Sequence, residues 1–327
     1  GQWSTGAVFA DVDGDGDLDL LVNSIGGGTR LFLNDGHGVF TESAGGRLAK
    51  KFGATSLALA DMDGDGIADL VHKSAAGDVF YFRNRPGLGW SARLPMSAED
   101  TTPPAPFGDV GVRTADLDLD KRIDVIQSVG DGGLNDYRIW FNLGNQSYSR
   151  PVTVPQDFGF SLADSRVQLN DLNGDRVPDL ARIEAAGIRV TAGLGYGRFA
   201  PPQFIPLPDG ALDDTQMARA RLVDINGDGL ADLVVERAAP GELWYWLNLG
   251  TYALAPMRRI NGMPLAVGPN AVTRWADLNG NGTVDLVYAD RDASPRITSV
   301  DLGELLTCGG IPNLLTSISN GIGRGTL

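Results

Sequence analysis

The chain has 327 residues, of which 43% are apolar and 21% charged, with 44 glycines and 18 prolines. This length suits either two average domains or one closed repeat fold, and the glycines and prolines indicate many turns. The formal net charge of −14 argues against nucleic acid and anionic membranes as partners. No run approaches the roughly 18 apolar residues needed to span a bilayer. The first residues lack the form of a secretion signal, so we expect either another export route or a start inside a longer chain.

Little in the composition predicts catalysis. The single cysteine, Cys308, excludes an internal disulfide and has no His or Cys neighbours that would make it a metal ligand, so it is interpreted as a small packed side chain. The two histidines, His37 and His72, stand 35 residues apart with no nucleophile at a known spacing to either. The sequence therefore predicts a protein that is not an enzyme.

A ten-residue segment occurs six times along the chain, every 50 to 55 residues. We name the copies loops 1 to 6 and count positions from the first aspartate. Their sequences are DVDGDGDLDL from Asp11, DMDGDGIADL from Asp61, DLDLDKRIDV from Asp116, DLNGDRVPDL from Asp171, DINGDGLADL from Asp224 and DLNGNGTVDL from Asp277.

The loops combine the ligand type and the turn chemistry of a calcium site. Oxygen-bearing side chains recur at positions 1, 3, 5 and 9, position 7 is variable and is expected to offer its backbone carbonyl, and glycine allows the sharp bend. Each loop is therefore predicted to bind one Ca²⁺. The predicted ligands are Asp11, Asp13, Asp15, Asp17 and Asp19 in loop 1; Asp61, Asp63, Asp65, Ile67 and Asp69 in loop 2; Asp116, Asp118, Asp120, Arg122 and Asp124 in loop 3; Asp171, Asn173, Asp175, Val177 and Asp179 in loop 4; Asp224, Asn226, Asp228, Leu230 and Asp232 in loop 5; and Asp277, Asn279, Asn281, Thr283 and Asp285 in loop 6.

The six loops differ in their predicted affinity. Loops 1 to 3 have four ligand carboxylates each, loops 4 and 5 have three, and loop 6 has two. Loop 3 has Leu119 and Lys121 in place of glycines, and loop 4 has Arg176 at position 6, so strain or a nearby cation is expected to weaken both. Six Ca²⁺ ions would move the formal net charge from −14 to about −2. The acidity is therefore mainly a property of the predicted metal sites.

The surroundings of the loops are typical of strands. An EF-hand needs a bidentate Glu at position 12 between two helices, but Val22, His72 and Gln127 occupy this position in the first three copies. Residues 7–10 and 18–22 flank loop 1, and residues 56–60 and 70–72 flank loop 2, as short β-prone segments. Each loop is therefore predicted to join two antiparallel strands.

After each of the first five loops comes a further strand, a glycine-containing turn and an aromatic residue. Residues 31–34 lead to Phe40 in this way, whereas residues 188–199 keep the pattern less cleanly, with Ala192 where other copies have Asn or Arg. Units of about 50 residues with about four strands have the size of propeller blades. We therefore predict an all-β fold, a β-propeller of six four-stranded blades, or seven if the sequence begins inside the ring. The predicted blades are near residues 1–50, 51–105, 106–160, 161–213, 214–266 and 267–305, and residues 306–327 form a connector that leaves the propeller.

These loops, followed by an aromatic strand and an N-x-G turn, resemble the FG-GAP/VCBS repeat of integrin α-subunit propellers and of many bacterial surface and secreted proteins. Phe52-Gly53 and Phe107-Gly108, eight or nine residues before a loop, match the Phe-Gly that names the repeat. The resemblance covers residues 1 to about 300 and implies the propeller fold and calcium.

The end of the chain carries a second resemblance. Residues 313–327, NLLTSISNGIGRGTL, are similar to the segment that follows the propeller in B components of bacterial insecticidal toxin complexes and in Salmonella virulence plasmid protein B-like proteins. The resemblance implies a propeller within a larger bacterial chain, secreted or at the cell surface, that docks onto a pore-forming A component. An N-terminal signal is not expected in this segment.

Two other functions stay open at the sequence level. Propellers of this type also occur as calcium-dependent lectins or adhesins that bind glycans or a host surface protein, and as accessory domains of exported hydrolases. The expected partner in the leading interpretation is a protein, with no nucleic acid and no membrane span.

Overall fold

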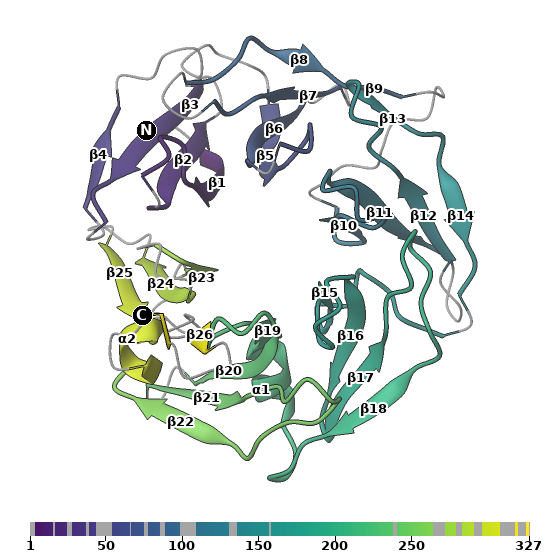
Figure 1. The fold of residues 1–327 in the computed structure, drawn as a ribbon, viewed down its shortest axis with the longest axis vertical. Coiled ribbons are helices and arrows are strands. Elements are labelled where there is room, and N and C mark those ends of the chain that lie inside the picture. The colour runs from purple at the N-terminus through teal and green to yellow at the C-terminus, as the bar shows by residue number, and fades with distance from the viewer. Residues whose placement is uncertain are drawn as a thin grey trace.

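The computed structural model describes residues 4–15, 17–24, 28–36, 39–43, 54–65, 67–74, 78–85, 89–98, 109–130, 136–156, 158–237, 241–263, 272–278, 283–290, 296–307, 318–319 and 325–326. Six β-sheets follow one another around a central axis, with the first strand of each sheet innermost (Figure 1). The predicted all-β propeller of six blades is confirmed. The described residues after the sixth sheet are a short helix at residues 302–307 and two paired two-residue strands at 318–319 and 325–326.

The first five blades each contain four antiparallel strands in chain order, and the described part of the sixth contains three. Blade 1 is β1 (Ser4–Ala10), β2 (Asp19–Ser24), β3 (Gly28–Asn34) and β4 (Phe40–Glu42), and blade 2 is β5 (Ala54–Ala60), β6 (Asp69–Ser74), β7 (Val79–Phe82) and β8 (Leu94–Pro95). Blade 3 is β10 (Val112–Ala115), β11 (Asp124–Val129), β12 (Asp136–Trp140) and β14 (Val152–Val154), and blade 4 is β15 (Val167–Asn170), β16 (Asp179–Glu184), β17 (Gly187–Thr191) and β18 (Gln203–Pro206). Blade 5 is β19 (Ala220–Val223), β20 (Asp232–Arg237), β21 (Glu242–Trp246) and β22 (Arg258–Asn261), and blade 6 is β23 (Val272–Ala276), β24 (Asp285–Asp290) and β25 (Arg296–Asp301).

Smaller elements lie outside the six sheets. Strands β9 (Ser97–Ala98) and β13 (Ser147–Tyr148) pair in parallel and so join blade 2 to blade 3. Helix α1 (Asp214–Arg219) connects blades 4 and 5, helix α2 (Leu302–Thr307) follows blade 6, and β26 (Ile318–Ser319) pairs with β27 (Gly325–Thr326). No helix among the described residues has the length and apolar character needed to cross a bilayer.

The register of the first two strands places every loop at the same end of its blade. The residue before position 1 pairs with the aspartate at position 9, as in Ala10 with Asp19 and Ala115 with Asp124. Each loop is therefore the connection of a hairpin between the innermost strand and the second strand, as predicted. Loops of neighbouring blades lie side by side on one rim: the N–H of Ile123 in loop 3 donates to Asp61 in loop 2, and that of Ala231 in loop 5 donates to Asp171 in loop 4.

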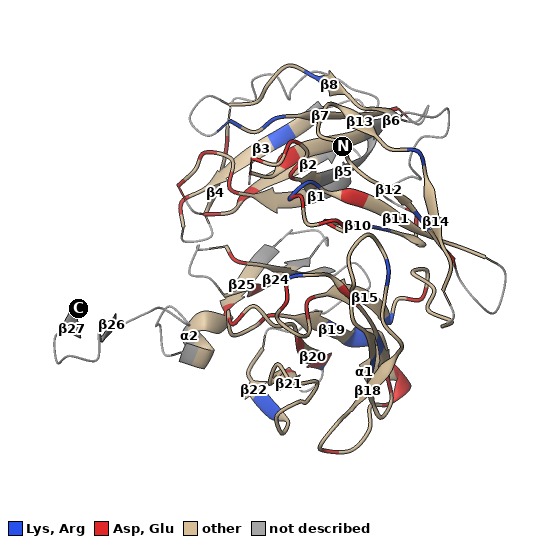
Figure 2. Cartoon of the chain, turned by 45° about the vertical axis from the view of Figure 1, so that its right-hand side comes forward, with Lys and Arg blue, Asp and Glu red and all other residues tan. Residues whose placement is uncertain are grey.

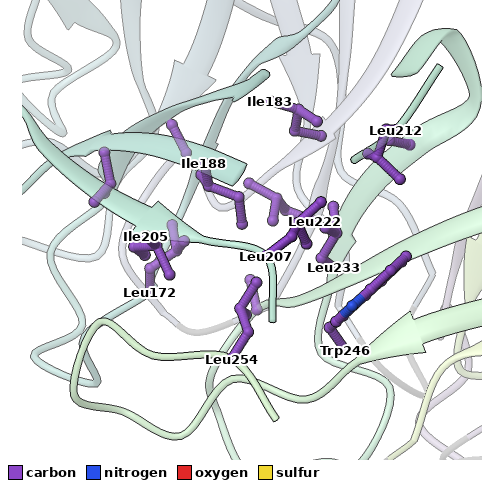
Figure 3. Close-up of a cluster of buried hydrophobic side chains, with 14 of the residues drawn as sticks. Leu172, Ile183, Ile188, Ile205, Leu207, Leu212, Leu222, Leu233, Trp246 and Leu254 are labelled. Atoms are coloured by element: carbon purple, nitrogen blue, oxygen red, sulfur yellow. The ribbon is translucent and has the colours of Figure 1, made fainter. Parts of the chain in front are cut away.

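The core lies between neighbouring blades rather than within one sheet. The cluster between blades 4 and 5 shows this: Leu172, Ile183 and Ile188 of blade 4 face Leu222, Leu233 and Trp246 of blade 5 (Figure 3). Comparable clusters join blades 1 and 2, blades 2 and 3, blades 3 and 4, and blades 5 and 6. A single four-stranded sheet cannot bury both faces, so packing against two neighbours is what removes its apolar side chains from water.

Candidate metal-binding loops

The loops share one internal hydrogen-bond pattern that holds their carboxylates together. The position 1 aspartate accepts the backbone N–H of position 4 at 2.7 Å in each of the first five loops. The position 5 aspartate accepts the N–H of position 7 at 2.8 to 3.0 Å in the same loops. These bonds form because the side chains satisfy backbone donors that the tight turn leaves without a strand partner.

The first three loops bring three carboxylates to one centre. The groups are Asp11, Asp13 and Asp15; Asp61, Asp63 and Asp69; and Asp116, Asp118 and Asp124; in each group one oxygen per residue lies within 4.8 Å of the others. Acidic residues, red in Figure 2, also recur in the other blades around the ring. Gathered oxygen ligands of this kind can hold a metal ion.

Loop 3 keeps the backbone of the turn without either glycine, and loop 4 keeps it without the second one. Leu119 and Lys121 in loop 3 have φ angles of 66° and 73°, and Arg176 in loop 4 has 68°, all in the left-handed region that glycine adopts at low cost. The backbone strain expected at these positions is therefore present. The hydrogen bonds of Asp116 and Asp171 to the same turns offset part of it.

The aspartate at position 9 is buried in every loop. Asp19, Asp69, Asp124, Asp179 and Asp232 have no exposed surface, and Asp285 is 2% exposed. Loss of water raises the pKa of Asp69, Asp124 and Asp232 to about 7 and of Asp179 and Asp285 to about 6, against the opposing effect of backbone hydrogen bonds. A nearby cation would stabilise the ionised form of all these groups.

Both oxygens of this aspartate already hold the backbone in place. In loop 3, Oδ2 of Asp124 accepts the N–H of Leu117 at 2.9 Å, and Oδ1 accepts the N–H of Asn142 at 2.8 Å. The same two bonds recur in loops 1, 2, 4 and 5. The sequence predicted position 9 as a metal ligand alone, whereas the structure also makes it the joint between the first and third strands.

Sequence reasoning missed the role of the asparagine that follows the third strand. The side-chain amide of Asn142 donates to the carbonyl of Met62 in the preceding blade at 3.1 Å, and that of Asn248 donates to Leu172 at 2.9 Å. Asn34 closes the ring in the same way, since its amide donates to Leu278 of blade 6 at 3.0 Å. The N-x-G pattern was the available signal, but it was interpreted only as a turn.

The fourth blade departs from this arrangement. The strand register aligns Gly193, rather than Ala192, with the asparagine of other blades, and in blade 2 the equivalent is Asn84 rather than Arg83. Gly193 has no side-chain amide to link the blades. The contact to blade 3 comes instead from the backbone N–H of Tyr196, which donates to Leu117.

The remaining predicted residues are distributed as follows. Loop 6 is described at Asp277, Thr283 and Asp285, while Asn279 and Asn281 lie outside the described residues, as do His37, Cys308, Phe52-Gly53, Phe107-Gly108 and most of residues 306–327. His72 lies in β6, 1% exposed, stacked on Phe80 with ring centroids 5.3 Å apart. It is a core side chain. The side chain of Arg122 is partly exposed and pairs with Asp120.

Two buried carboxylate oxygens support a fit to a cation. Oδ1 of Asp118 in loop 3 and Oδ1 of Asp285 in loop 6 are buried and have no hydrogen-bond partner. A buried acceptor without a donor is costly, and a bound cation is one way to satisfy it. The oxygen-only donor set matches hard cations such as Ca²⁺ better than zinc, which prefers nitrogen and sulfur.

Solved structures with the same fold come from toxins and lectins. A chain of the Photorhabdus luminescens Tc holotoxin pore superposes with a TM-score of 0.73 at 22% identity, covering 98% of this chain and 14% of that one. An Agrocybe aegerita lectin that recognises non-reducing terminal N-acetylglucosamine superposes with a TM-score of 0.57 at 21% identity, covering 91% of this chain and 79% of the lectin. The BP39L lectin of Burkholderia pseudomallei superposes with a TM-score of 0.50 at 15% identity, covering 91% of this chain and 81% of the lectin. This chain thus spans about a seventh of the length of the toxin chain.

None of the curated proteins matches this sequence. The FG-GAP-like repeat family, in contrast, matches residues 11–72, 171–235 and 224–288, together more than half of the chain. Each matched segment begins at the first aspartate of a loop and ends in the second strand of the next blade. The chain therefore belongs to the FG-GAP-like repeat family.

Proposed function

We propose that this chain is a non-catalytic, calcium-binding propeller that serves as a docking scaffold for a protein partner. The observation that carries the metal part is the repeated cluster of three carboxylates within 4.8 Å. When bound, Ca²⁺ would neutralise the loop carboxylates and join the start of each loop to the second strand. The residues proposed as ligands are those predicted from the sequence, with loops 1 to 3 as the best supported.

The docking part rests on the rigidity and the side chains of the loop-bearing rim. Leu119 lies in loop 3, and Leu143, Leu194 and Leu249 follow the third strand of blades 3, 4 and 5; these side chains are 38% to 57% exposed. Their backbones are fixed by the position 9 aspartates and the blade contacts. Exposed apolar side chains on a rigid frame are typical of protein contact surfaces.

The toxin-complex B-like interpretation names the partner. The sequence resemblance at residues 313–327 supports it, and so does the shared fold with a toxin chain of which this chain would be a small part. In this proposal residues 1–305 form the propeller, residues 306–327 lead out of it, and the whole protein is secreted or at the bacterial surface. The partner is then the pore-forming A component.

Two measurements test this proposal. Isothermal titration of the metal-stripped protein with CaCl₂, together with metal analysis, is expected to show several sites; no binding would refute the metal part. Pull-down with the cognate A component is expected to capture the calcium-loaded protein. The double variant Leu143→Asp/Leu249→Asp is expected to lose this binding at an unchanged melting temperature. Val110→Asp serves as a control, because Val110 is an exposed apolar residue before β10, at the opposite end of that strand from loop 3.

A lectin is the second candidate, and the fold similarity to two lectins over about 80% of their length favours it. A glycan array with the calcium-loaded protein distinguishes the two functions. Clear binding of a glycan together with no capture by the A component would replace the docking proposal with the lectin.

A further inference from the structure

Loops 2 and 3 each carry an arginine on one of their predicted ligands. Nε of Arg83 lies 2.9 Å from Oδ2 of Asp63, at ion-pair distance but without the alignment of a hydrogen bond. In loop 3 the guanidinium of Arg122 pairs with Oδ2 of Asp120, and its Nε donates to the carbonyl of Asn142 at 3.0 Å. The described residues show no such arginine on the carboxylates of loops 4 and 5.

The two arginines occupy places where the other blades have no positively charged side chain. Arg83 precedes the asparagine that follows the third strand, and its register equivalents are Leu33, Phe141 and Leu247. Arg122 stands at position 7, where loops 2, 4 and 5 have Ile67, Val177 and Leu230. The charges are therefore not part of the repeat pattern.

Arg122 lies at the junction of blades 2 and 3, and Arg83 lies beside Tyr81, which belongs to the apolar cluster between these two blades. Loops 2 and 3 belong to neighbouring blades, and the N–H of Ile123 donates to the carbonyl of Asp61 at 3.0 Å between them. The stem of Arg122 reaches across this junction, since a Cβ added to Gly64 of loop 2 would lie 3.4 Å from its Cγ. Loops 2 and 3 together contain eight predicted ligand carboxylates, and two of these are paired with guanidinium groups.

A guanidinium and a calcium ion make opposite demands on the same oxygen. Asp63 is one of the three carboxylates gathered in loop 2. Its side chain is only 11% exposed, so the carboxylate oxygen that faces Arg83 has little contact with water. A cation bound among these carboxylates would have to displace or repel the arginine charge. Without a metal, the same charge relieves the repulsion between the clustered carboxylates.

We propose that Arg83 and Arg122 are built-in counter-ions that hold the junction of blades 2 and 3 in the absence of metal and compete with calcium for loops 2 and 3. The competition half rests on the proposed calcium binding, while the counter-ion half does not. The loops would then bind calcium at different concentrations. Loops 2 and 3 would fill at higher calcium concentration than their four carboxylates alone suggest.

The test compares three variants of the whole chain. Arg83→Leu introduces the residue found at Leu33 and Leu247, and Arg122→Met removes the charge but keeps the stem that packs on Gly64. The control is Arg30→Leu, because Arg30 is equally exposed, at 43% against 40% for Arg83, but pairs with Glu42 outside the loops. Melting temperatures are measured in EDTA and in saturating calcium, and calcium affinity by isothermal titration.

We expect Arg83→Leu and Arg122→Met to lower the melting temperature by about 1–3 °C more in EDTA than in saturating calcium. Arg122→Met also loses the hydrogen bond from Nε to Asn142, which lowers the melting temperature equally in both conditions. One site in each variant should bind calcium about two- to fivefold more tightly, the range expected for an ion pair of this exposure. The control should shift equally in both conditions. Equal losses with and without calcium, or an unchanged calcium affinity, would overturn the proposal. A wild-type protein that binds no calcium would instead refute the proposed metal function, whatever the variants do in EDTA.

Discussion

At the scale of single residues, the blade junctions depend on a few buried polar side chains. Asn142 shows the arrangement: its backbone N–H donates to Asp124, and its side-chain amide donates to Met62 of the neighbouring blade. Asn142 is 1% exposed, so water cannot replace either bond. One side chain therefore connects the third strand, the metal loop and the next blade.

Asn142→Ala is expected to lower the free energy of unfolding by about 1–3 kcal/mol, because the carbonyl of Met62 loses its buried donor. Urea unfolding followed by tryptophan fluorescence measures the loss. Asn145→Ala, an exposed position in the same turn, should change stability by less than about 0.5 kcal/mol. Similar losses in the two variants would show that the amide bond between the blades is unimportant.

His72 is a second residue whose effect depends on its surroundings. Neither ring nitrogen has a hydrogen-bond partner, and the ring packs on Phe80 and Phe82. Burial lowers the pKa of His72 from 6.5 to about 4. The positive charge of Arg93, whose guanidinium lies 4.0 Å from the centroid of the Phe80 ring, makes a smaller contribution. The unfolded chain therefore binds a proton more readily than the folded one between pH 6.5 and 4.

This difference predicts an acid-sensitive contribution to stability. The stability that neutral His72 provides is complete above pH 6.5 and is lost as the pH falls toward 4, by up to about 3 kcal/mol. In His72→Leu this part of the pH dependence should disappear. The measurement is the difference between wild type and variant in unfolding free energy from pH 7 to 4.5, since the loop carboxylates affect both proteins alike. A constant difference would contradict the prediction.

At the scale of elements, the turn after the third strand fixes how neighbouring blades fit. In blade 4 this turn contains Gly195 and Gly197, with φ angles of 76° and 66°. A Cβ on Gly197 would lie 1.8 Å from Cδ1 of Ile139 in blade 3, whereas one on Gly195 would approach nothing closer than 3.9 Å. Both glycines permit the left-handed backbone, but Gly197 also permits the close approach of two blades.

These two glycines allow a matched comparison. Gly195→Ala is expected to cost about 1 kcal/mol, the cost of a left-handed alanine. Gly197→Ala should cost about 1–3 kcal/mol more, because Ile139 is fully buried and cannot move freely. Thermal unfolding of the two variants measures the difference. If the two losses are equal, the packing of this turn on blade 3 is not as tight as the geometry implies.

At the scale of the whole molecule, the ring closes through contacts between residues far apart in sequence. Asn34 and Leu278 are separated by 244 residues and bring blade 1 to blade 6. Closure makes each blade depend on two neighbours, so a change in one loop is transmitted through the apolar clusters between blades.

Removal of calcium is therefore expected to destabilise the whole ring in one transition. A ligand that binds only the folded state adds about 2.7 kcal/mol per site at a hundredfold excess over its dissociation constant. The melting temperature should fall in excess EDTA relative to millimolar calcium, and it should recover when calcium is restored. An identical melting temperature in both conditions, with metal analysis confirming depletion, would contradict calcium binding at these loops.

The sequence alone determined the fold class and the position of each loop, and it indicated six blades while leaving seven open. Aspartates and glycines at set spacings act within ten residues, where backbone geometry and ligand chemistry are local, and the strands around them follow from short apolar segments. The repetition of one unit then indicates the ring.

Tertiary structure decided which side chains join the blades. The burial of Asp124, the amide bond of Asn142 to Met62 and the approach of Arg83 to Asp63 join residues from different strands or blades, and no spacing in the sequence marks them. The same applies to Gly193, which replaces the asparagine in blade 4 and is identified only by the strand register. These contacts exist because packing the blades side by side excludes water, and each buried polar group must then find its partner on a neighbouring strand or blade.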